Sequence, residues 1–225
     1  MLLDFLNDTI IVTGHYGTGK TNLSVNLAYS LAANGKKITL ADLDIVNPYF
    51  RSADFKEKLE QDGMGFVSSV YANSNVDVPA LSPALDPKIG AEGTLIVDVG
   101  GDDAGAFALG RYSARIKEKP YTMIYVVNAY RYLTRKPEEA IELLKEIETA
   151  SRLKVTHIAN NSNLSGLTTV EDIQKSMDFA RKIAEIAGMP LAFTSVKRKV
   201  YELLPDKQGF YPVDIYVKAP WSEGE

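Results

Sequence analysis

The chain contains no cysteine among its 225 residues. It therefore has no disulfide bond, no zinc site built on thiolates and no iron–sulfur cluster held by its own side chains. It also lacks a run of about eighteen apolar residues and a charged, cleavable N-terminal signal, so we expect a cytoplasmic protein. The net charge of −4 gives no overall attraction to nucleic acid, which is therefore not indicated as a partner.

The composition is that of a globular domain. Apolar residues make up 45% of the chain and charged residues 24%, which are ordinary fractions for such proteins. A chain of 225 residues is long enough for a core on both faces of a sheet. No internal repeat, low-complexity tract or linker interrupts the sequence, so we expect one domain over residues 1–225.

A glycine-rich loop is the most informative motif. It follows the β-branched segment 8–13 and precedes a helical segment that ends at Gly35. The loop fits the pattern G-x-x-x-x-G-K-[ST], in which backbone N–H groups bind nucleotide phosphates. The predicted nucleotide-binding residues of this loop are Gly14, His15, Tyr16, Gly17, Thr18, Gly19, Lys20, Thr21 and Asn22. Lys20 is expected to reach the β- and γ-phosphates, and the Thr21 hydroxyl to coordinate Mg²⁺.

Strand-like and helix-like segments alternate along the chain. This alternation predicts a mostly parallel sheet of about seven strands between two helical layers, a three-layer α/β/α fold. The expected strands are residues 8–13, 36–42, 66–71, 94–99, 121–128, 153–160 and 190–196. The expected helices are residues 20–34, 49–61, 104–118, 135–151 and 169–187.

Acidic side chains stand at the ends of two expected strands. Asp42 and Asp44 follow one strand, and Asp98 lies near the end of another. Ligands of open α/β sheets bind at the carboxyl ends of the strands, where a carboxylate can hold Mg²⁺ or orient an attacking water. Gly101 stands three residues after Asp98, a spacing that suits a loop whose Gly101 N–H senses the γ-phosphate. The alternatives are helix capping for Asp42 and Asp44 and a solvated turn around Asp98.

The order of the phosphate loop, Asp42-x-Asp44 and Asp98-x-x-Gly101 resembles the ParA/MinD/Mrp group of P-loop ATPases. This CobQ/CobB/MinD/ParA group also contains ATP-binding enzymes of the cobyrinate-amidase type, and residues 42–48 look like a segment of bacterial tyrosine kinases. The resemblance extends from about residue 8 to residue 196. It implies that Lys20 and Asp44 are catalytic, with Asp44 positioning the water. It also implies that Asp42 and Asp98 act with Thr21 on Mg²⁺.

The same resemblance implies that Asn160, at the end of the sixth expected strand, recognises the base. The alternative is that Asn160 is a turn residue. Guanine recognition would need an acid after Asn160, and residues 161–163 contain none. We therefore expect ATP as the nucleotide and keep GTP as the alternative.

His15 marks a departure from the group. Its members place a second lysine at this position, which reaches the nucleotide of the partner subunit in a dimer. Neutral imidazole is a poor replacement for a fixed cation on phosphate. A homodimer around the nucleotide therefore stays open, and Arg51 and Arg111 are candidates for a replacement cation or are ordinary surface residues.

These features together predict a Mg²⁺-dependent nucleotide-binding protein, an ATPase that acts as a switch with an unidentified protein partner. The alternatives are a small-molecule phosphotransferase, an ATP-dependent ligase of the cobyrinate-amidase type, and a nucleotide-binding adaptor that does not hydrolyse. Pro205, Pro212 and Pro220 interrupt the C-terminal segment, so we expect no amphipathic helix that anchors the chain to a membrane.

Overall fold

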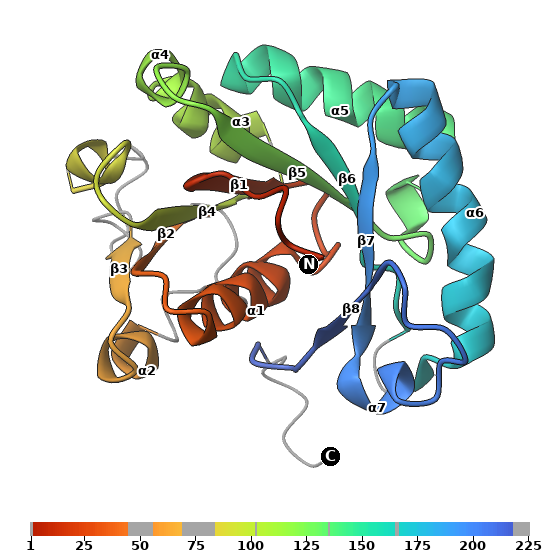
Figure 1. The fold of residues 1–225 in the computed structure, drawn as a ribbon. Coiled ribbons are helices and arrows are strands. Elements are labelled where there is room, and N and C mark those ends of the chain that lie inside the picture. The colour runs from red at the N-terminus through yellow and green to blue at the C-terminus, as the bar shows by residue number, and fades with distance from the viewer. Residues whose placement is uncertain are drawn as a thin grey trace, which may run out of the picture.

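Figure 1 shows the fold in a computed structural model that describes residues 2–44, 56–68, 84–101, 103–134, 136–164 and 167–217. Eight strands form one sheet in the order β3–β2–β4–β1–β5–β6–β7–β8. Every neighbouring pair in this sheet is parallel. The strands are β1 (Thr9–Thr13), β2 (Ile38–Leu43), β3 (Gly65–Ser68), β4 (Thr94–Val99), β5 (Tyr121–Val127), β6 (His157–Asn160), β7 (Leu191–Lys197) and β8 (Phe210–Val213).

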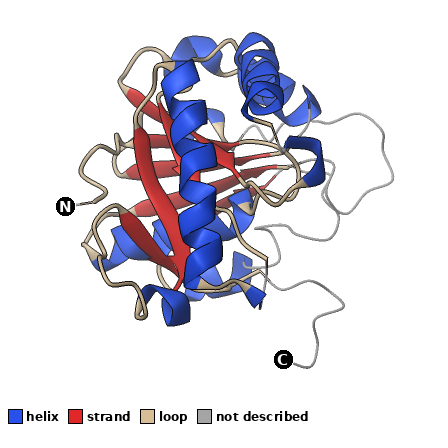
Figure 2. Ribbon diagram, turned by 90° about the vertical axis from the view of Figure 1, so that its right-hand side faces the viewer, coloured by secondary structure: helices blue, strands red, loops and turns tan. Residues whose placement is uncertain are grey.

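Helices connect the strands and cover both faces of the sheet, as Figure 2 shows from a second direction. The helices are α1 (Lys20–Ala33), α2 (Lys56–Gln61), α3 (Asp103–Gly110), α4 (Ser113–Ile116), α5 (Pro137–Ser151), α6 (Val170–Ala187) and α7 (Arg198–Tyr201). Two short 3₁₀ helices are η2 (Asp86–Lys88) and η3 (Tyr132–Thr134). Within the described part of the chain, none of these helices combines the length and the apolar character needed to cross a membrane.

Successive side chains of the central strands belong to two separate cores. Ile11 of β1 packs in the cluster that α3, α5 and α6 cover, whereas Ile10 and Val12 pack in the cluster under α1 and α2. This division follows from the two-residue period of a strand. Because both faces are covered, the central strands consist of almost continuous apolar runs such as that of β4.

The expected α/β fold with a parallel sheet is confirmed, but the sheet has eight strands rather than about seven. The additional strand, β8, contains Pro212 and lies at the edge of the sheet, where a missing backbone N–H is tolerated. Its Tyr211 ring packs against Phe193 of β7, with ring centroids 5.1 Å apart. Proline made this edge strand hard to find in the sequence.

Several expected element bounds differ from the structure. The helix expected over 104–118 is divided into α3 and α4, because Gly110 lies against α5: a Cβ on Gly110 would stand 2.5 Å from the Ala150 carbonyl oxygen. β6 begins at His157, four residues later than expected. The expected helix over 49–61 and strand over 66–71 are described only as α2 and β3, because their remaining residues lie outside the described parts.

Candidate functional site

The glycine-rich loop joins the carboxyl end of β1 to the first turn of α1. Gly14, Gly17 and Gly19 have positive φ angles of 141°, 73° and 85°, which residues with a Cβ rarely adopt. Gly19 is the N-cap of α1 and makes no side-chain capping bond. The first N–H groups of α1 therefore face the loop without a side-chain cap, an arrangement that favours anions.

Lys20 is buried within this loop, with 6% of its surface exposed. Its Nζ donates a hydrogen bond to the His15 carbonyl oxygen at 3.0 Å. The Thr18 hydroxyl donates to the same oxygen at 2.8 Å. The ammonium group is thus held among the backbone groups of the loop, where both the charge and the N–H donors attract an anion.

Three buried aspartates lie at the ends of the two neighbouring strands β2 and β4. Asp42 and Asp98 are direct register partners, and Asp44 follows β2. Their exposed fractions are 4% for Asp42, 1% for Asp98 and 9% for Asp44. The Asp44 N–H donates to Oδ1 of Asp42 at 2.9 Å. Carboxylates are rarely so deeply buried unless they serve an interaction there.

Asp98 has the most unusual environment of the three. Ser24 of α1 donates to its Oδ1 at 3.3 Å, while its Oδ2 has no hydrogen-bond partner among the described residues. Burial raises the pKa of Asp98 to about 8, and the charge of Asp42 raises it as well. The Lys20 ammonium and the nearby Thr21 hydroxyl act in the opposite direction. An open, buried carboxyl oxygen therefore lies beside the Thr21 hydroxyl and the Lys20 ammonium.

Gly101 brings the chain after β4 into contact with the phosphate loop. A Cβ on Gly101 would stand 2.5 Å from the Tyr16 backbone nitrogen and 2.8 Å from Lys20 Nζ. A residue with a side chain would not fit in this contact without displacing one of the two segments. The two motifs recognised in the sequence thus meet at Lys20.

Asn160 is completely buried at the end of β6. Its Nδ2 donates to Ser176 Oγ at 2.9 Å, and its Oδ1 accepts bonds from the backbone and hydroxyl of Ser162. A direct contact of the Asn160 side chain with a nucleotide base would require these bonds to be exchanged. Base recognition by Asn160 stays a prediction.

Asn161, the next residue, contacts the phosphate loop and was not singled out by the sequence. Its Nδ2 donates to the Thr18 carbonyl oxygen at 2.6 Å, and the Ser195 hydroxyl donates to its Oδ1. The amide therefore links the ends of β6 and β7 to the loop. The only sequence signal was a second polar residue after an expected strand.

Asn22 uses its side chain to hold the segment after β8. Its Nδ2 donates to the Asp214 carbonyl oxygen at 3.0 Å, and its Oδ1 accepts from the Tyr216 N–H at 2.8 Å. The contribution of Asn22 to nucleotide binding is therefore expected from its backbone N–H in the first turn of α1.

Arg51 and Arg111 are the two candidates for a replacement cation. Arg51 lies outside the described residues. Arg111 is exposed just after α3, a helix of eight residues, so it lies about 12 Å along the helix axis from the start of α3.

Comparisons with known proteins concern both the family and the fold. The family model of the CobQ/CobB/MinD/ParA nucleotide binding domain matches residues 9–188. The comparison with curated proteins found no match.

Similar solved structures include the signal recognition particle 54 kDa protein of Aeropyrum pernix K1 in complex with GDP. It has a TM-score of 0.54 and 20% identity over 83% of this chain and 40% of that chain. Cell division protein FtsY of Thermotoga maritima has a TM-score of 0.56 and 21% identity over 92% and 65% of the two chains. FtsY of Mycoplasma mycoides has a TM-score of 0.57 and 20% identity over 88% and 63%.

These identities show a shared fold, and this chain spans less than two thirds of the length of each of the three structures. The family match is more specific, because it extends from the start of β1 to the residue after α6. The chain therefore belongs to the family of CobQ/CobB/MinD/ParA nucleotide-binding domains.

Proposed function

We propose that this protein binds ATP together with Mg²⁺, hydrolyses it, and acts as a nucleotide-dependent switch. One observation carries the proposal: the Lys20 ammonium, the open Oδ2 of Asp98 and the close approach of Gly101 all occur at one point of the phosphate loop. A cation, a metal-binding oxygen and a γ-phosphate sensor are the parts that phosphoryl transfer needs.

The phosphates would be bound by the backbone of the loop and by Lys20. N–H groups of the loop and of the first turn of α1 would donate to the α- and β-phosphates. Lys20 Nζ, now bonded to the His15 carbonyl at 3.0 Å, would exchange this neutral acceptor for charged phosphate oxygens. Hydrogen bonds to charged groups contribute roughly 1.5–3 kcal/mol each, more than the bond that is given up.

Thr21 and Asp98 would hold Mg²⁺, and Asp42 would bind its water ligands from the register position opposite Asp98. Among the described residues, no group of three His, Cys, Asp or Glu side chains is arranged to hold a metal alone. Mg²⁺ in phosphate sites takes one or two protein ligands and completes its shell with waters and phosphates. The donor set therefore fits a metal ion that arrives with the nucleotide, and this ion supplies charge neutralisation at the phosphates.

Asp44 would orient the water that attacks the γ-phosphate. The bond from its N–H to Asp42 Oδ1 holds its backbone beside Asp42. The Gly101 N–H would contact the γ-phosphate, and its release after hydrolysis would free the segment that leads into α3. Order in this segment would then depend on the nucleotide, as in other nucleotide switches.

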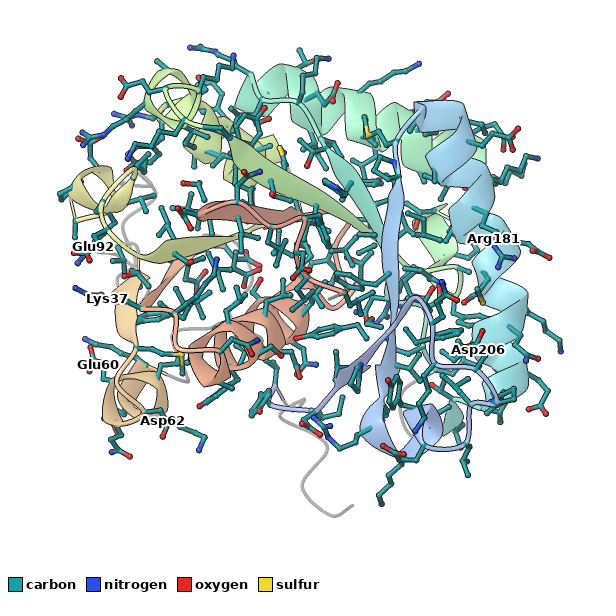
Figure 3. All side chains as sticks on the ribbon, in the orientation of Figure 1. Lys37, Glu60, Asp62, Glu92, Arg181 and Asp206 are labelled. Atoms are coloured by element: carbon teal, nitrogen blue, oxygen red, sulfur yellow. The ribbon has the colours of Figure 1, made fainter. Side chains whose placement is uncertain are left out.

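The proposal is tested by calorimetry of nucleotide binding and by phosphate release, each with and without Mg²⁺. Lys20→Ala should abolish binding, whereas Asp44→Ala should bind but hydrolyse at least roughly 100-fold more slowly. Asp206→Ala is the matched control, because Asp206 is an exposed aspartate on the segment before β8 (Figure 3). Wild-type hydrolysis by Asp44→Ala would refute its role, and unchanged binding by Lys20→Ala would refute the proposed site.

The choice of ATP over GTP rests on residues 161–163, which offer no carboxylate to a guanine base. The GDP bound by the Aeropyrum pernix protein keeps GTP as the alternative. Competition between ATP and GTP in the binding assay decides between the two nucleotides. Turnover that requires an added small-molecule acceptor would instead identify a phosphotransferase or ligase of the cobyrinate-amidase type.

A further inference from the structure

The turn after β5 places an arginine side chain against the phosphate loop. A Cβ on Gly17 would stand 3.2 Å from Cζ and 3.3 Å from Nε of Arg131. The guanidinium group therefore packs on the loop at its fourth residue, although Arg131 belongs to a different element of the chain.

Hydrogen bonds to two other elements fix the turn that carries this arginine. Within the turn, Asn128 Oδ1 accepts from the Tyr130 N–H at 3.0 Å. The Ala129 N–H donates to Ser162 Oγ after β6 at 2.8 Å, and the Tyr130 hydroxyl donates to the Asp172 carbonyl of α6 at 2.7 Å. The guanidinium is thus presented from a backbone that is held in place before any ligand binds.

The charge of Arg131 is available for an anion. The side chain is exposed, and no carboxylate of the described residues forms an ion pair with it. Arg115, Arg181 and Arg198, by contrast, each pair with an aspartate. A guanidinium offers several N–H groups in a planar arrangement that matches phosphate oxygens.

The contact point indicates which phosphate is within reach. Gly17 directly follows Tyr16, and the Tyr16 backbone nitrogen is one of the atoms that Gly101 approaches. Gly101 also approaches Lys20 Nζ, the group that would bind the β- and γ-phosphates. Arg131 therefore contacts the loop one residue from the point that Gly101 approaches, on the β5 side of β1.

We propose that Arg131 binds the β/γ-phosphate edge of the nucleotide held by its own chain. The inference rests on the proposed nucleotide function and adds a specific residue to it. Arg131 supplies the second cation, the one that a lysine at position 15 would provide and His15 does not. A second subunit is then not needed to bring a cation to the triphosphate.

The test compares triphosphate and diphosphate binding by calorimetry in Mg²⁺, with the non-hydrolysable β,γ-imido analogues of ATP and GTP and with ADP and GDP. Arg131→Ala should weaken triphosphate binding roughly 10-fold to 100-fold and diphosphate binding much less. Arg131→Lys should restore part of the loss, because it keeps the charge but not the planar donors, and Arg131→Gln should restore none. Arg181→Ala removes an exposed arginine of α6 that pairs with Asp178 (Figure 3), and this variant should bind like the wild type.

Two outcomes would overturn the inference and leave the proposed function intact. If Lys20→Ala abolishes binding while Arg131→Ala changes neither affinity, Arg131 does not contact the phosphates. If Arg131→Ala weakens both affinities equally and lowers the melting temperature, the arginine only supports the loop. Unchanged binding by Lys20→Ala would instead refute the proposed function.

Mixing two variants tests whether Arg131 acts in its own chain. Lys20→Ala keeps the arginine but should not bind nucleotide, whereas Arg131→Ala keeps the phosphate loop. If the arginine acted across a dimer, the mixture would recover ATP hydrolysis. We expect no recovery, and a recovered rate would refute action within one chain.

Discussion

Adding one methyl group at Gly101 should disturb nucleotide binding while leaving the protein folded. The Cβ of Gly101→Ala would stand 2.5 Å from the Tyr16 nitrogen, 2.7 Å from the Tyr16 Cα and 2.8 Å from Lys20 Nζ. Ordinary contacts between such atoms are about 3.5–4 Å, so the two segments must separate by about 1 Å. Two of the three contacts are to backbone atoms, so a rotation of a flexible side chain cannot relieve them.

The expected magnitude follows from this displacement. Overpacking of this kind costs roughly 1–3 kcal/mol, equivalent to about 2–12 °C in melting temperature for a domain of this size. A shift of about 1 Å takes N–H groups out of hydrogen-bond range of the phosphates. A misplacement of that size can reduce activity about 100-fold. We therefore expect triphosphate affinity to fall about 10-fold to 100-fold, with hydrolysis at least equally reduced.

Gly188→Ala separates the effect on the site from the effect on stability. Gly188 ends α6 with φ 64°, and a Cβ there would meet no atom within 4 Å. Alanine in this left-handed conformation costs roughly 1–2 kcal/mol, a loss comparable to that expected for Gly101→Ala. Nucleotide titration and urea unfolding of both variants form the assay. If Gly101→Ala binds the triphosphate as tightly as Gly188→Ala does, the approach of Gly101 to the loop is not part of the site.

Three further predictions concern other residues. Asp98→Asn should remove the Mg²⁺ dependence of nucleotide affinity without lowering the free energy of unfolding of the nucleotide-free protein, because burial raises the pKa of Asp98 to about 8 and the amide then replaces a carboxyl group that is mostly neutral near pH 7. A large loss of stability would show that the carboxyl group supports the fold. Asn161→Ala should destabilise the protein by roughly 1–3 kcal/mol in urea unfolding and weaken nucleotide binding, because the Thr18 carbonyl and the Ser195 hydroxyl lose their hydrogen bonds to the Asn161 amide. A stability and an affinity equal to those of the wild type would contradict this. Burial lowers the pKa of His157 below its ordinary 6.5, so the stability present above that pH is lost as the pH falls below it. His157→Gln should show a shallower loss of stability in this acidic range, and identical slopes would refute the reasoning.

Local patterns were sufficient to predict the central strands and the phosphate loop. The loop combines three glycines with Lys20 and Thr21 within eight residues, so its chemistry can be recognised without knowledge of the fold. β4 was predicted with its observed bounds, because a strand buried on both faces is an uninterrupted apolar run. The division of the expected helix over 104–118 could not be predicted in this way, because it depends on the packing of Gly110 against a different helix.

The contacts of Arg131 and Asn161 could not be predicted, because they depend on strand order. Both residues follow strands that are distant from the phosphate loop in sequence, and nothing local indicates that β5 lies beside β1 and β6 beside β5. Arg131 also resembles an ordinary surface residue, since its side chain is exposed. The sequence instead favours Arg51 and Arg111 as replacement cations, because they follow the two acidic strand ends.

The observed strand order divides the polar groups of the site by charge. β4 and then β2 lie on one side of β1, and they carry Asp98, Asp42 and Asp44. β5 and then β6 lie on the other side and lead into Arg131 and Asn161. The phosphate loop leaves β1 between these two groups, so a triphosphate bound there would have acidic metal-binding groups on one flank and hydrogen-bond donors on the other. Arg131 already brings a positive charge to the phosphate loop. Phosphate binding would therefore not need a lysine at position 15, where this chain has a histidine.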